Sequence, residues 1–123
     1  QFYVENPNED DPNSQLTLSC KMTQRSSDIA VAGGWNIVTG ALFTIMLASV
    51  CKLKPKTLIW SLGDVHIYNN LKEQIQTQIK REPYLYPIVN LINPPEKIED
   101  FSLENFEILG YQGHAPIKLI MNV

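Results

Sequence analysis

Apolar and polar residues alternate along the first part of the chain. Gln1-Phe2-Tyr3-Val4 is a short apolar run typical of a strand. From Leu16 to Thr23 apolar residues at even positions alternate with polar residues at odd positions, and this period of two predicts a strand with one buried face. Cys20 lies on that face and is expected to be a packing thiol. Residues 5–15 are all polar and include two prolines, which predicts the exposed connection of a long hairpin.

An uncharged stretch extends from Ile29 to Cys51. Two interpretations compete: a membrane span, or an apolar helix in the core of a soluble domain. Gly33-Gly34 suggests a turn, which leaves residues 35–51, a helix too short to span a membrane comfortably. Polar residues also interrupt the stretch, and the mean hydropathy of the chain is −0.14. The pattern therefore favours a buried core helix.

The second half alternates short elements with turns. After a basic turn at residues 52–56, strands are expected at 58–60 and 63–68, and in the latter Asp64, His66 and Tyr68 share one face. A helix is expected to follow, with Asn70 as its N-cap, Glu73 in a capping box and Pro83 as its end. Further strands are expected at residues 88–92, 106–109 and 117–121. These elements predict one α+β domain with mixed α/β layers.

Composition and charge exclude several classes of function. The net charge is −3, from 13 acidic against 10 basic residues, and four of the acids lie within residues 5–11. The rest of the chain is close to neutral, so no basic nucleic-acid stripe is evident. Two cysteines make neither a disulfide scaffold nor a zinc site, and the two histidines lie in separate segments, so no metal is expected. A reduced, intracellular setting fits this composition.

Three groups of polar residues are candidates for chemistry. Arg25 and Ser26, with Asp28 nearby, offer a guanidinium fork and a hydroxyl suited to phosphate, although a surface arginine beside an acid is the commoner explanation of such a cluster. Asn36 lies inside the apolar stretch, where a buried amide must form hydrogen bonds. It either binds backbone groups of the protein or binds the edge of a planar ligand. For His66 and Tyr68 three interpretations are open: acid–base catalysis, binding of a ribose, or a polar face of the sheet.

Several motifs resemble those of thymidylate synthases, in order and at matching spacing. They are Gln24-Arg25-Ser26-Ser27-Asp28, Trp35-Asn36-Ile37, Gly63-Asp64-Val65-His66-Ile67-Tyr68-Asn69-Asn70, Gln78 through Arg81-Glu82-Pro83, Ile98-Glu99-Asp100-Phe101, Phe106-Glu107, Tyr111, His114 and Ile117-Lys118. The resemblance covers the chain apart from residues 5–15. It implies that residues 1–123 are the C-terminal part of a single domain, with a large mixed β-sheet, a central buried helix, and 5–15 as an exposed polar loop insertion.

The resemblance also assigns roles to residues. For the nucleotide dUMP it implies phosphate ligands at Arg25 and Ser26, pyrimidine contacts at Asp28 and Asn36, and ribose contacts at His66 and Tyr68. Asn36 resembles the amide that reads the O4/N3 edge of uracil. For the folate it implies contacts from Asp28, Val31, Trp35, Asn122 and Val123, with the C-terminal carboxylate in a tail that closes over the site. Gly34 stands where the family usually has Pro, and Trp35 stands where it usually has Phe. Asn122 replaces the family's usual Ala.

The family's nucleophile is a cysteine in a Pro-Cys-His context, and neither Cys20 nor Cys51 fills that position. We expect it upstream of Gln1, so the chain carries no catalytic residue and is expected to act only with the N-terminal half of the enzyme. The implied reaction is the reductive methylation of dUMP to dTMP with the cosubstrate 5,10-methylenetetrahydrofolate, in a cytoplasmic homodimer that uses a sheet face around residues 16–22. The alternatives are a pyrimidine deoxynucleotide hydroxymethylase of the same superfamily and a non-catalytic nucleotide-binding or dimerisation fragment.

Overall fold

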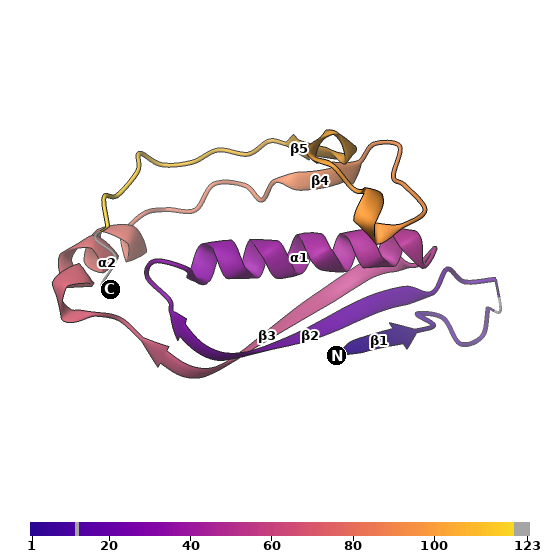
Figure 1. Ribbon diagram of the computed structural model, residues 1–123, viewed down its shortest axis with the longest axis horizontal. Helices are drawn as coiled ribbons and strands as arrows, with labels where there is room; N and C mark the ends of the chain where they lie inside the picture. Colours follow the sequence, from indigo (N-terminus) through magenta and orange to yellow (C-terminus); the bar gives the residue numbers. More distant parts are fainter. Residues whose placement is uncertain (12, 120–123) are drawn as a thin grey trace.

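A long helix lies between a twisted β-sheet and an extended arm (Figure 1). The computed structural model describes residues 1–11 and 13–119. The chain forms β1 (Phe2–Glu5), β2 (Thr17–Asp28), α1 (Gly33–Val50), β3 (Lys54–His66), the 3₁₀ turn η1 (Asn69–Leu71), α2 (Lys72–Ile79), β4 (Ile88–Leu91), the 3₁₀ turns η2 (Ile98–Asp100) and η3 (Leu103–Asn105), and β5 (Phe106–Leu109). The structure therefore confirms a mixture of sheets and helices.

The main sheet has the order β1-β2-β3 and is mixed. β1 pairs with β2 antiparallel and β2 pairs with β3 parallel, with α1 as the crossover between the parallel strands. β3 is continuous where two strands and a basic turn were expected, because residues from Lys54 onward pair with β2. β4 and β5 form a separate two-stranded hairpin in the arm.

β2 is longer than the predicted strand and is covered on both faces at its start. Leu18 and Cys20 are buried, as the alternation predicts, but Thr17 and Ser19 are buried as well. β2 is the central strand, and Glu5 of β1 receives hydrogen bonds on the second face: its carbonyl from the Thr17 hydroxyl and its carboxylate from the Ser19 hydroxyl. Leu18 and Cys20 lie in the core of the single chain, and the dimer contact around residues 16–22 stays a prediction.

α1 is only partly the buried helix that was expected. It buries a single stripe against the sheet, formed by Gly33, Gly40, Thr44 and Ala48. Within the part of the chain that the structure describes, α1 is long and apolar enough to cross a membrane by length and composition alone. The core helix of a soluble protein meets the same two criteria, and α1 packs along β2 and β3.

Two further predictions are corrected, one at the start of α2 and one near the C-terminus. α2 begins at Lys72 with Leu71 as N-cap, because residues 69–71 form η1, so the predicted Asn70 cap is wrong. Leu71 anchors this turn and is 1% exposed. Residues 117–119 are irregular rather than a strand, and the remainder of the predicted last strand lies outside the described residues.

Candidate functional site

The carboxyl ends of β2 and β3 lie side by side and carry four of the predicted nucleotide residues, Arg25, Ser26, Asp28 and His66. Because the two strands are parallel, Ser26 lies opposite Asp64 and Asp28 lies opposite His66. The Ile29 amide donates a hydrogen bond to the His66 carbonyl at 3.3 Å and extends the pairing by one residue. Open α/β sheets bind ligands beyond the carboxyl ends of their strands, so this edge is the expected place for a site.

Acidic, imidazole and phenol side chains at the end of β3 and just beyond it form a small cluster. Asp64 Oδ1 lies 3.6 Å from His66 Nδ1, and the His66 and Tyr68 rings meet edge to face with centroids 5.5 Å apart. The prediction that these three side chains share a face is therefore confirmed. Two hydrogen-bonding rings fixed next to each other are a suitable donor and acceptor pair for a hydroxyl group.

Asp28 shapes the turn that leads from β2 into α1. Its carboxylate accepts a hydrogen bond from the Val31 amide at 3.3 Å, and its carbonyl accepts one from the Ala32 amide at 2.9 Å. The Asn36 amide then donates to the Ala32 carbonyl at 2.9 Å, which continues the helix. This short connection places Asn36, half-buried in α1, a few residues from the end of β2.

The Arg25 backbone on β2 lies against Gly63 of β3. A Cβ atom at Gly63 would lie 2.6 Å from the Arg25 carbonyl oxygen, so the glycine is needed for the close approach. The Arg25 side chain is exposed, and among the described residues it forms no ion pair. The Ser27 hydroxyl, in a residue only 4% exposed, has no hydrogen-bond partner within the described part of the chain. Arg25 thus offers an exposed cation at this edge, whereas the unsatisfied Ser27 hydroxyl is buried.

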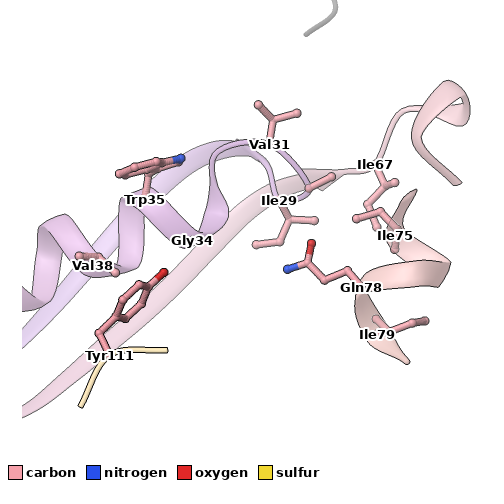
Figure 2. A pocket seen from close by; sticks show the side chains of 11 residues that line it. Ile29, Val31, Gly34, Trp35, Val38, Ile67, Ile75, Gln78, Ile79 and Tyr111 are labelled. Carbon is pink, nitrogen blue, oxygen red and sulfur yellow. The ribbon is translucent and has the colours of Figure 1, made fainter. Parts of the chain in front are cut away.

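A cavity of about 590 Å³ opens beside this edge (Figure 2). Its walls come from the β2–α1 turn, the first turns of α1, the end of β3, α2 and the arm; they are Ile29, Ala30, Val31, Gly34, Trp35, Val38, Ile67, Ile75, Gln78, Ile79 and Tyr111. Two predicted folate residues, Val31 and Trp35, therefore line one cavity. The six predicted nucleotide residues lie outside its lining, and Asn122 and Val123 lie outside the described residues.

The polar groups of the cavity wall, Gln78 and Tyr111, belong to the matching motifs, but sequence reasoning assigned them no role in the site. The Gln78 amide points into the cavity from α2, and the Tyr111 hydroxyl points toward it from the arm (Figure 2). The helical spacing of Ile75 and Ile79 was visible in the sequence, but the approach of α2 and the arm to Trp35 was not, because these segments are distant along the chain. The cavity combines apolar walls with a few polar groups, as is typical of sites for flat organic ligands.

Comparison with known proteins decides the family. A family profile described as thymidylate synthase matches residues 1–123. The chain belongs to the thymidylate synthase family. It is 42% identical, over all 123 of its residues, to the thymidylate synthase of Homo sapiens, and the match covers 36% of that protein. The chain thus spans about a third of the length of this thymidylate synthase relative. Within the described residues there is no group of three or more His, Cys, Asp or Glu side chains placed to hold a metal ion.

Proposed function

We propose that this chain is the nucleotide- and folate-binding part of a thymidylate synthase. The longer enzyme would convert dUMP and 5,10-methylenetetrahydrofolate to dTMP and dihydrofolate. The folate supplies the methylene carbon and then a hydride, and is itself oxidised. The observation that carries the proposal is the parallel register of β2 and β3, which sets Ser26 opposite Asp64 and Asp28 opposite His66 in a chain of this family.

Nucleotide binding begins with the phosphate. The exposed Arg25 guanidinium can donate two parallel hydrogen bonds to phosphate oxygens, and the Ser26 hydroxyl can donate a third. A single arginine that meets one dianion locally also agrees with the near-neutral charge of the rest of the chain. Asp28 lies three residues after Arg25 on the same strand. Its backbone amide is assigned to the pyrimidine base.

The base and the sugar are assigned to the neighbouring groups. Uracil presents a donor at N3 and an acceptor at O4, and the Asn36 amide offers the matching acceptor and donor on one plane. The edge-to-face pair of His66 and Tyr68 is assigned to the ribose 3′-hydroxyl. These groups lie at the start of α1, at the end of β3 and, for Tyr68, just beyond β3.

The folate is assigned to the cavity in front of Trp35. An indole ring and the apolar Val31 side chain suit the flat aromatic part of a folate, and the Asp28 carboxylate is assigned to the pterin. Asn122 and Val123 are proposed to close the site and exclude water. We expect the nucleophilic cysteine, which must add to C6 of the pyrimidine to activate C5, on the part of the enzyme that this chain does not include. We place the enzyme in the cytoplasm.

The test uses the chain joined to the residues of human thymidylate synthase outside the matched region. The joined protein should form dTMP and dihydrofolate in equal amounts and a covalent adduct with 5-fluoro-dUMP and methylenetetrahydrofolate. Arg25→Ala should raise the KM for dUMP at least tenfold, since a hydrogen bond to a charged group contributes about 1.5–3 kcal/mol. Leu103→Ala, on an exposed turn distant in sequence from the site, is the control. An unchanged KM in Arg25→Ala would refute the phosphate assignment.

A hydroxymethylase of the same superfamily remains the second candidate. Its reaction adds water where the synthase transfers hydride, so the folate is not oxidised. Product formation without dihydrofolate would therefore favour it. A joined protein that binds dUMP but forms neither product nor adduct would favour the third candidate, a nucleotide-binding or dimerisation fragment.

A further inference from the structure

A histidine ties the last part of the described chain to the segment that follows α2. Within that part, residues 111–119 form neither helix nor strand, so regular backbone pairing does not fix their position. The His114 Nε2 atom lies 2.9 Å from the Glu82 carbonyl oxygen. The His114 ring also stacks on the Tyr84 ring, with centroids 4.5 Å apart and planes 29° apart. These two contacts are called the His114 clamp below.

The clamp combines a directed hydrogen bond with a ring stack. A carbonyl oxygen can only accept a hydrogen bond, so Nε2 of His114 carries a hydrogen atom and donates it to Glu82. Together the two contacts fix both the place and the orientation of the imidazole. They lie near the surface, since Tyr84 is 46% exposed and His114 is exposed. Loss of the clamp should therefore shift the chain locally and leave the rest of the fold intact.

The clamp joins the two segments that supply the polar groups of the cavity wall. Gln78, near the end of α2, lies four residues before Glu82, and Tyr111 lies three residues before His114. The Tyr111 side chain also lies against the residue that precedes His114, because a Cβ atom at Gly113 would be 3.3 Å from the Tyr111 hydroxyl oxygen. The position of the His114 ring is therefore transmitted to the Tyr111 hydroxyl over a short distance.

Tyr111 is an exposed residue whose position depends on the chain around it. Its side chain is 72% exposed, and it lines the cavity together with Trp35 and Gln78 (Figure 2). A side chain that is ordered before a ligand arrives loses less conformational entropy on binding than a mobile one. A contact that fixes the chain next to Tyr111 therefore strengthens binding in the cavity.

We propose that His114 is a positioning residue of the folate cavity. Through the clamp it holds the Tyr111 hydroxyl in the cavity wall, where this hydroxyl can form a hydrogen bond with a polar group of the folate. The inference rests on the proposed function, because that function assigns the folate to this cavity. His114 itself lies outside the cavity lining, so it acts through Tyr111.

The experiment measures folate binding by the joined protein described above. Calorimetry with dUMP and tetrahydrofolate, which has no methylene group to transfer, gives the Kd for the folate without catalysis. Steady-state kinetics add kcat and the KM for methylenetetrahydrofolate. His114→Ala should raise this Kd and this KM about fivefold, as expected for the loss of one hydrogen bond. It should leave kcat and the KM for dUMP unchanged, because it weakens folate binding and not the chemical step.

Three further variants test the route from His114 to the cavity. His114→Phe keeps a ring that can stack on Tyr84 but cannot donate to Glu82, so its Kd should lie between those of the parent and His114→Ala. In a Tyr111→Phe background, His114→Ala should cause no further rise, because the hydroxyl that it positions is already absent. Tyr84→Ala should behave like His114→Ala.

Tyr86→Ala is the matched control, since it removes the same kind of ring from a 93% exposed position two residues after Tyr84; it should bind folate like the parent. Circular dichroism checks that each variant is folded. An unchanged Kd in His114→Ala, or additive effects of His114→Ala and Tyr111→Phe, would refute the role of His114 alone. The expected changes in Kd without any formation of dTMP would refute the proposed function alone. A joined protein that binds no tetrahydrofolate would overturn both.

Discussion

At the scale of single residues, two glycines differ in whether the fold has room for a side chain at their position. Gly63 is needed because the Arg25 carbonyl oxygen occupies the space where a Cβ would lie, whereas Gly34 in the first turn of α1 has no atom within 4 Å of that position. A glycine costs backbone entropy wherever a side chain would fit. The two positions should therefore respond to alanine in opposite directions.

We predict that Gly63→Ala lowers the free energy of unfolding by about 1–3 kcal/mol, because β2 and β3 must separate to admit the methyl group. Gly34→Ala should raise it by about 0.5 kcal/mol, since alanine is the better helix former. Urea unfolding followed by circular dichroism measures both. Equal effects of the two substitutions would contradict the close approach at Arg25.

Glu5 provides a pH-dependent contact across the sheet. Its carboxylate lies 3.2 Å from the Lys56 ammonium and accepts a hydrogen bond from the Ser19 hydroxyl. Both contacts lower the pKa of Glu5, and the contact with Lys56 has the larger effect. A carboxyl whose pKa is lowered by folding stabilises the protein above the pKa of its unfolded form. That contribution is lost as the pH falls through the lowered pKa of the folded form.

Lys56→Met should therefore raise the pKa of Glu5 toward its ordinary value, and an NMR titration of the Glu5 carboxyl carbon measures this change. Lys72→Met, on α2, removes the same charge elsewhere and should leave the titration as in the parent. A Glu5 titration unaffected by Lys56→Met would show that the ion pair does not form in solution.

At the scale of elements, the end of α1 depends on one backbone conformation. Lys52 has φ of 58°, in the left-handed region, and the Leu53 amide returns to the Ala48 carbonyl at 2.8 Å. This is the usual way for a helix to end, and glycine normally occupies the left-handed position. The reversal then feeds directly into β3, so the parallel pairing depends on it.

Lys52→Gly should stabilise the protein by about 1 kcal/mol, because it removes the cost of a side chain in the left-handed region. Lys54→Gly, two residues later in β3, should instead destabilise it, since glycine weakens a strand. Thermal unfolding of the two variants makes the comparison. A lower melting temperature for Lys52→Gly than for the parent would contradict the prediction.

At the scale of the whole molecule, the second face of the sheet carries exposed apolar side chains beside the buried Thr17 and Ser19. Leu58 and Trp60 face α1, so the residue between them, Ile59, faces the other way and is half exposed. Tyr3, paired with Ser19, lies on the same side and is also exposed. We propose that this face, rather than Leu18 and Cys20, forms the contact of a homodimer.

Ile59→Arg in the joined protein should shift its mass from dimer to monomer at micromolar concentration, because it buries an unpaired charge at the contact. Light scattering over a dilution series measures the mass. Ile108→Arg, an exposed position on β5, is the control. A dimer that persists in Ile59→Arg would exclude this face as the interface.

The sequence by itself determined the local features of this protein. The alternation of residues 16–23 predicts a strand, the uncharged stretch after Ile29 predicts a helix, and the spacing of Asp64, His66 and Tyr68 predicts a shared face. These succeed because each depends on residues a few positions apart, whose geometry the backbone period fixes. The family, too, was readable from short motifs.

Tertiary structure alone decided how those parts meet. The register of β2 against β3, the approach of α2 and Tyr111 to Trp35, and the burial of Thr17 and Ser19 all join residues distant along the chain. The side of α1 that would face the sheet was equally hidden, because a helix that is apolar all round carries no pattern to orient it. Close packing settled the orientation: the side with Gly33, Gly40 and Ala48 is buried against the strands, and Trp35 and Val38 are exposed.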